Sequence, residues 1–65
     1  MYRVISQDFI GNHALLEVNK ELPKKKYHKY LIDGKEYDCV PVYDLPNHIA
    51  INSDEGFIGK KVEFI

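Results

Sequence analysis

The segment YHKYLIDGKEYDCVPVY, residues 27–43, decides the fold. Two runs of β-prone residues flank Asp33-Gly34, a dipeptide that accepts the positive φ angles of a type I′ turn. A two-residue loop of this kind fixes which residues of the two flanking strands face each other. The sequence therefore predicts an antiparallel hairpin that reverses at Asp33-Gly34.

The register of this hairpin follows from the loop length. It pairs Ile32 with Lys35, Leu31 with Glu36, Tyr30 with Tyr37, Lys29 with Asp38, and Tyr27 with Val40, and it sets His28 opposite Cys39. In this register an aromatic side chain faces another aromatic side chain, and a cation faces an anion. Each such cross-strand pair stabilises the sheet by roughly 0.2–1 kcal/mol. One face carries Tyr30, Ile32, Tyr37 and Cys39, which we assign to the core.

The first third of the chain predicts a second hairpin. Residues 2–9 alternate in polarity, Gly11-Asn12 suits a tight turn, and residues 13–19 can run back with every second side chain apolar. A helix over 13–22, capped by Asn12 and stopped by Pro23, is the alternative. The apolar positions give no clean 3.6-residue stripe, so the pattern favours a strand and leaves the helix open.

The last third predicts two more strands and one short helical turn. Residues 48–52 place Ile49 and Ile51 on one face, and residues 60–65 do the same with Val62 and Phe64. Between them, Ser53-Asp54-Glu55 can cap a helical turn near 53–58, ended by Gly59.

Together these elements predict one all-β, mainly antiparallel domain over residues 1–65. Five or six short strands with regular turn signals favour a small barrel or sandwich. The predicted domain is SH3-like or OB-like in size, and this comparison rests on the number and length of the strands alone.

Composition excludes several classes of protein. The 65 residues are 45% hydrophobic and 29% charged with a net charge of −1, too apolar for obligate disorder. No apolar run exceeds three residues, so we expect neither a membrane span nor a secretory signal. The lone Cys39 excludes an internal disulfide and favours a reducing cytoplasm, with an intermolecular disulfide as the alternative.

The sequence gives little support for catalysis or for metal binding. Cys39 opposite His28 is the pairing of a nucleophile with a base, but a sheet of this size leaves little room for a pocket and an orienting group. His13, His28 and His48 lack the close spacing of zinc ligands. We expect no enzyme, no metal and no cofactor.

The basic stretch Lys24–Tyr30 interleaves cations with aromatic rings, as proteins that bind single-stranded nucleic acid do. The nucleic-acid contacts in this hypothesis are Lys24, Lys25, Lys26, Tyr27, Lys29, Lys60 and Lys61. Residues 1–32 carry six basic and three acidic groups, whereas residues 33–65 carry three and seven. The isoelectric point near 6.3 is low for a dedicated nucleic-acid domain, so this hypothesis ranks second.

A non-enzymatic protein-interaction module ranks first. Five tyrosines and no tryptophan provide large side chains with a polar tip, a type enriched at protein interfaces. The candidate contacts are Tyr27, Lys29 and Tyr43, with Lys24, Lys25 and Lys26 as the rim. Binding a partner protein or a second copy would block, bridge or recruit. Small stand-alone chains of this kind are common in bacteria and phages, the source we expect.

Overall fold

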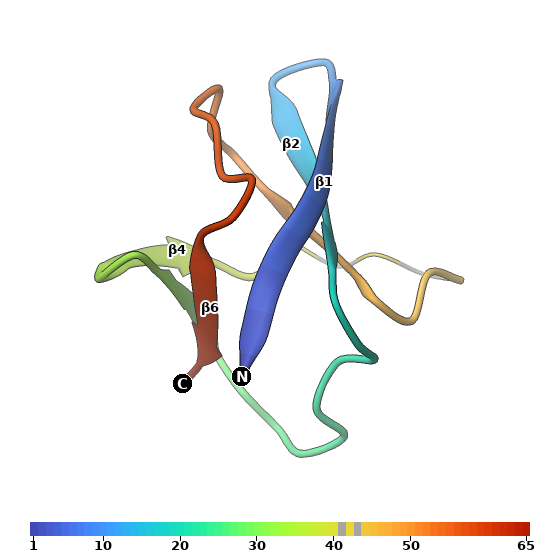
Figure 1. The fold of residues 1–65 in the computed structure, drawn as a ribbon, viewed down its shortest axis with the longest axis vertical. Helices are drawn as coiled ribbons and strands as arrows, with labels where there is room; N and C mark the ends of the chain where they lie inside the picture. The colour runs from blue at the N-terminus through green and yellow to red at the C-terminus, as the bar shows by residue number, and fades with distance from the viewer. Residues whose placement is uncertain (41, 43) are drawn as a thin grey trace.

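The computed structural model describes residues 1–40, 42 and 44–65. It contains six strands: β1 (Tyr2–Ile10), β2 (His13–Val18), β3 (Lys29–Ile32), β4 (Lys35–Asp38), β5 (His48–Ile51) and β6 (Lys61–Phe64). All pairings are antiparallel, in the order β4-β3-β6-β1-β2-β5 (Figure 1). The predicted all-β class is confirmed. The described residues form no helix, and so none that is long and apolar enough to cross a membrane.

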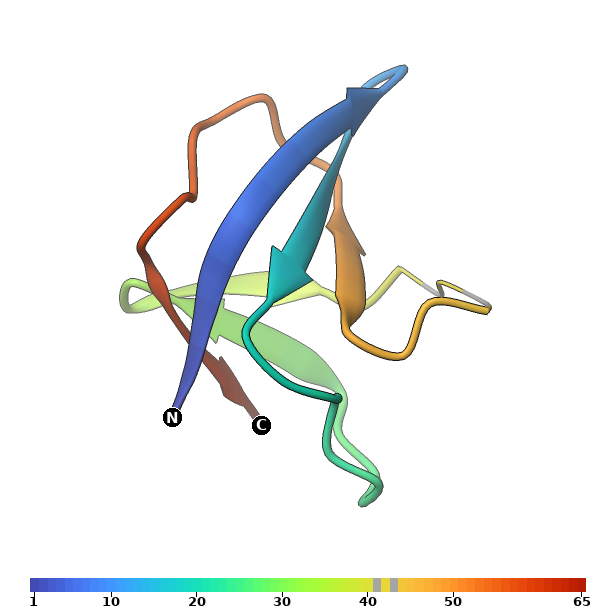
Figure 2. The ribbon, with the colours of Figure 1, turned by 45° about the vertical axis from the view of Figure 1, so that its right-hand side comes forward.

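Strand β1 joins the two halves of the sheet. Its start pairs with β6 through Tyr2↔Val62, and its longer remainder pairs with β2. The register shifts between Val4 and Ser6, and a bulge of this kind bends and twists a strand. The halves β4-β3-β6 and β2-β5 therefore curl around a common interior (Figure 2).

Among the residues that the structure describes, no ladder closes the curled sheet. Its outer strands are β4 and β5, and one isolated bridge, Val40↔Ala50, joins the residues after β4 to β5. The described strands therefore form a single open sheet that is strongly curled, which is the loose form of the predicted barrel or sandwich.

The hairpin at Asp33-Gly34 forms as predicted. Asp33 has φ 53° and Gly34 φ 83°, as a type I′ turn requires, and the four pairs from Ile32↔Lys35 to Lys29↔Asp38 are all present. Tyr30 and Ile32 are buried, while Tyr37 and Cys39 are half-buried against the core.

Beyond Lys29↔Asp38 the predicted register is wrong. The backbone N–H groups of His28 and Lys29 donate to the carbonyl of Ile65, at 2.6 and 3.0 Å, which keeps the chain before β3 on β6. On the other side Val40 crosses to Ala50. The β3–β4 ladder therefore pairs neither Tyr27 with Val40 nor His28 with Cys39, because the segment before β3 and the segment after β4 each pair with a different part of the chain.

The segment 13–19 is a strand, which decides between the two alternatives left open by the sequence. Ala14, Leu16 and Val18 are fully buried, and Gly11 at φ 61° serves the turn before them. Period-two burial on β2 is the pattern of a strand with one face on the core.

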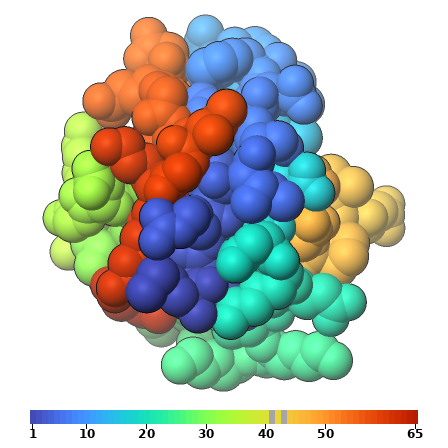
Figure 3. Space-filling model, in the orientation of Figure 1, coloured from blue at the N-terminus to red at the C-terminus, as the bar shows by residue number. Residues whose placement is uncertain are grey.

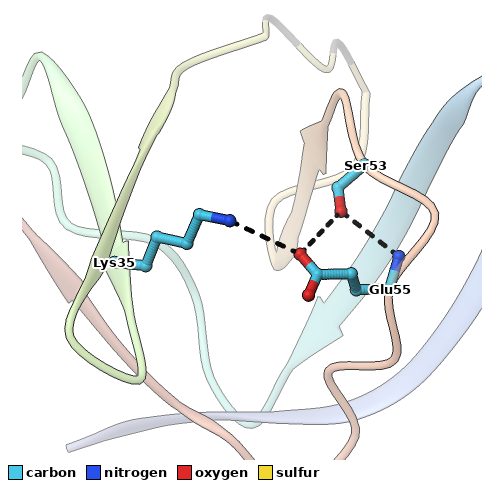
Figure 4. Close-up of polar contacts among 3 residues, drawn as sticks. All are labelled: Lys35, Ser53 and Glu55. Carbon is cyan, nitrogen blue, oxygen red and sulfur yellow. Dashed lines mark hydrogen bonds and ion pairs between the residues drawn. The ribbon is translucent and has the colours of Figure 1, made fainter.

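The helical turn predicted near 53–58 is wrong. The N–H of Phe57 donates to Gln7 Oε1 at 2.7 Å, so it is not available to a carbonyl one helical turn earlier. Ser53 does act as a local cap, because its hydroxyl accepts the Glu55 N–H at 3.2 Å (Figure 4). The segment then ends in a turn in which the Lys60 N–H donates to the Phe57 carbonyl at 2.9 Å and Gly59 takes φ 85°.

The core occupies the inside of the curl and is apolar throughout the described residues. It consists of Val4, Ala14, Leu16, Val18, Tyr30, Ile32, Ile49, Ile51, Phe57 and Val62. Phe64 closes one end through edge contacts with Tyr2, Tyr27 and Tyr30, at centroid distances of 4.8, 4.9 and 5.7 Å.

Candidate functional site

An apolar groove of about 300 Å³ lies on the outer face of β2 and β5. Its lining consists of Ile10, His13, Leu15, Val40, Val42, Leu45 and Ala50. We call it the β2–β5 groove. The described residues that line it include no aspartate, glutamate, lysine or arginine, although it faces away from the core. The outer face of an antiparallel sheet is usually polar, so this surface is unusual.

The sequence builds this groove by placing Leu15 and Ala50 on the outer face of two strands whose inner face is apolar. Ala14 and Leu16 point inward, which turns Leu15 outward, and Leu15 pairs directly with Ala50 of β5. The bridge from Val40 to Ala50 then brings the segment after β4 alongside as a wall.

Two large apolar side chains of the β2–β5 groove are exposed. Ile10, at the end of β1, is 64% exposed, and Leu45 is 39% exposed. A cluster of apolar groups left in solvent is costly, and such patches mark places where another molecule binds.

A second groove, of about 420 Å³, lies where β1 begins and β6 ends. Its lining consists of Met1, Tyr2, Pro23, Lys25, Lys61, Val62, Glu63 and Phe64. We call it the base groove. In Figure 3 the dark blue start of the chain lies beside its red end and the teal start of the β2–β3 connection. This groove differs from the first in carrying charge on its rim.

The predicted contact residues do not share one surface. Tyr27 is half-buried with its ring against Phe64 and Tyr30, and this burial is the first cause that raises the pKa of its hydroxyl. Lys29 Nζ lies 2.9 Å from Asp38 Oδ1, and this hydrogen bond raises the Lys29 pKa. Tyr43, like Pro41, lies outside the described residues.

The predicted lysines divide into paired and exposed groups. Lys60 is 3.2 Å from Asp33, and Lys61 is 3.1 Å from Glu63. Lys24, Lys25 and Lys26 are exposed in the β2–β3 connection, and among the described residues they form no ion pair. Of the predicted basic residues, the base groove brings together Lys25 and Lys61.

Cys39 is half-buried beside Tyr30. Burial is the largest effect that raises its pKa, and a hydrogen bond with Tyr30 acts in the opposite direction. A raised pKa keeps the thiol protonated near neutral pH, and a protonated thiol is a weak nucleophile. Among the described residues, no three His, Cys, Asp or Glu side chains are grouped so that they could hold a metal ion.

The residues of the β2–β5 groove were missed at the sequence level, although a signal was present. Ala14-Leu15-Leu16 and Ile49-Ala50-Ile51 are apolar without interruption, and such runs indicate strands covered on both faces. Within this chain only one face of each is covered by the core. Comparisons of the chain with protein-family models, with curated proteins and with solved structures return no match.

Proposed function

We propose that this chain is a non-enzymatic module that binds an apolar segment of a protein in the β2–β5 groove. The observation that carries the proposal is the lining of that groove, six apolar side chains and one histidine on the outer face of a sheet. Its chemistry matches apolar side chains, because its described lining residues include no lysine or arginine to hold a phosphate or a carboxylate.

The dimensions of the groove fit this role. A volume of about 300 Å³ accommodates one or two large side chains rather than a whole domain. Protein interfaces commonly concentrate their binding energy in a few anchors that fill such pockets. The exposed Ile10 and Leu45 on its two sides would be covered by the bound segment.

The module would act by occupancy, so that it blocks, bridges or recruits its partner. The partner is a different protein or a second copy of the chain. The reducing cytoplasm remains the compartment we propose, because Cys39 is the single thiol of the chain.

The test combines photocrosslinking with a matched control. A photoreactive residue at Leu45 should give a discrete protein adduct in cells of the native source, and the adduct should disappear with Ile10→Ser. The same residue at Ile58 is the control, since Ile58 is 66% exposed but does not line the groove. A discrete adduct of twice the chain mass would identify self-association.

Two outcomes would contradict the proposal. One is the absence of any discrete adduct from Leu45, together with a monomeric mass by light scattering up to millimolar concentration. The other is an adduct pattern that is the same from Leu45 and Ile58.

A further inference from the structure

The base groove has an aromatic floor that is held in place before any ligand binds. Phe64 contacts Tyr2 and Tyr27 edge-to-face, and the Tyr2 hydroxyl donates to the carbonyl of Glu21 at 2.7 Å. These contacts fix both rings of the floor. The parts of Tyr2 and Phe64 that remain exposed line the groove.

The rim of the base groove is dominated by cations. Lys25 and Lys61 line it, and Lys20 Nζ lies 4.7 Å from the centroid of the Tyr2 ring. The one carboxylate in the lining, Glu63, is engaged by Lys61.

The concentration of positive charge affects the Met1 amino group, which also lies at this groove. Its pKa is lowered, first by a hydrogen bond with Lys20 and then by the charge of Lys20, with a smaller effect of Lys61. Like charges held together in this way favour an anionic occupant.

We infer that the base groove binds single-stranded nucleic acid, with a base against the exposed part of the Phe64 ring and neighbouring phosphates at Lys25 and Lys20. Ring surface beside cations is the combination that binds single strands, because rings stack with bases of any sequence and cations follow the phosphates. Lys24 and Lys26, exposed next to Lys25, extend the cationic track along the β2–β3 connection. An acidic peptide would use the cations but not the exposed part of the Phe64 ring.

This surface differs from the one that the sequence suggested. Tyr27 supports Phe64 from the side instead of receiving a base, and Lys29 and Lys60 are held by Asp38 and Asp33. The inferred surface instead includes Tyr2, Lys20 and Phe64, all of which lie outside the Lys24–Tyr30 stretch.

The experiment is a titration of the ¹⁵N-labelled full chain with a ten-residue oligothymidylate, at 50 and 200 mM NaCl. Amide shifts should concentrate at Tyr2, Lys25 and Phe64, and affinity should fall at the higher salt. Lys25→Gln should weaken binding about 5- to 10-fold at 50 mM NaCl and reduce the slope of log K against log salt by about 0.7. Phe64→Leu should weaken binding further, with its folding checked by its amide spectrum.

The matched control is Lys35→Gln, which removes one exposed lysine that does not line the groove and should leave binding unchanged. The inference is overturned by unchanged spectra at 1 mM oligothymidylate and 50 mM NaCl. It is also overturned by equal losses from Lys25→Gln and Lys35→Gln, or by polyglutamate producing the same shifts at Phe64. Ile10→Ser should bind the oligonucleotide normally, so failure here and failure of the protein-binding proposal are distinguishable.

Discussion

The side chain of Gln7 serves Phe57 as a strand partner would. Gln7 Oε1 accepts the N–H of Phe57 at 2.7 Å, and Gln7 Nε2 donates to the carbonyl of Glu55, also at 2.7 Å. The side-chain amide of Gln7 thus accepts one hydrogen bond and donates another, as the backbone of a paired strand residue would. It ties β1 to the loop between β5 and β6.

Replacement of Gln7 by Leu should lower the stability of the fold. The variant keeps side-chain bulk but leaves the N–H of buried Phe57 and the carbonyl of Glu55 without their partner. An unpaired buried polar group costs about 1–3 kcal/mol, and we expect a loss of that size in the free energy of unfolding. Urea denaturation measures it. Asn52→Ala, at an exposed position, is the control, and equal midpoints for Gln7→Leu and the wild type would contradict this role.

Leu15 and Leu16 should respond differently to the same substitution. Leu16 is fully buried in the core, so Leu16→Ala should cost about 2–5 kcal/mol. Leu15 lies in the β2–β5 groove, so Leu15→Ala should cost much less in stability while weakening capture of the partner. Thermal unfolding and the Leu45 crosslink measure the two effects. A loss of stability from Leu15→Ala as large as that from Leu16→Ala would show that Leu15 belongs to the core.

Two glycines offer a direct test of backbone conformation. Gly34 has φ 83°, and an added Cβ would meet nothing within 4 Å, so the penalty of Gly34→Ala is backbone strain alone. We expect a loss of about 1–2 kcal/mol. Gly56 is equally open but lies outside the left-handed region, so Gly56→Ala should cause no comparable loss. Chemical denaturation of both variants checks this, and equal losses would mean that φ at Gly34 is not the cause.

The protein should lose stability in alkali. Burial is the first cause that raises the pKa values of Cys39, Tyr27 and Tyr30, and the charge of Cys39 raises those of the tyrosines further. These groups ionise more easily in the unfolded chain, so the unfolded state loses protons first as pH rises. Their contribution is complete below their ordinary pKa values, near 9 for the thiol and 10 for the hydroxyls, and is lost above them.

Urea unfolding between pH 7 and 11 measures this effect. Stability should begin to decline near pH 9, and the decline should be shallower for Tyr30→Phe, which removes the hydroxyl with the largest shift. Stability that is constant up to pH 11 would contradict the assignment of these groups to partly desolvated positions.

Local chemistry explains which strand pairs could be predicted. The turn at Asp33-Gly34 needs positive φ at two consecutive residues, and this requirement alone aligns Tyr30 with Tyr37 and Lys29 with Asp38. The prediction failed at the next two pairs, His28 with Cys39 and Tyr27 with Val40. At these positions, extension of the hairpin competes with pairing to β6 or β5, which come from distant parts of the sequence.

The segment 53–58 illustrates the same division. Ser53 was recognised as a cap and does bind the Glu55 N–H. The helical turn is absent because Gln7, 50 positions before Phe57, takes the N–H that the turn would have used. Glu55 also forms an ion pair with Lys35 of β4 (Figure 4), with 3.7 Å between Lys35 Nζ and Glu55 Oε2.

The candidate sites depend on contacts that no local pattern contains. Leu15 meets Ala50 only through the pairing of β2 with β5, and Lys25 reaches Phe64 only because the β2–β3 connection passes the end of β6. The sequence pointed to the lysines but not to the rings that they border.

By itself the sequence determined the class of fold, both hairpin turns and the buried face of β2, because turn angles and period-two alternation act over a few residues. The tertiary structure alone decided how far each ladder runs, where the sheet remains open, and which apolar and cationic groups share a groove. Those outcomes are set by competition among segments that are distant in the chain, and the competitor that wins is the one that satisfies the most backbone hydrogen bonds and buries the most apolar surface.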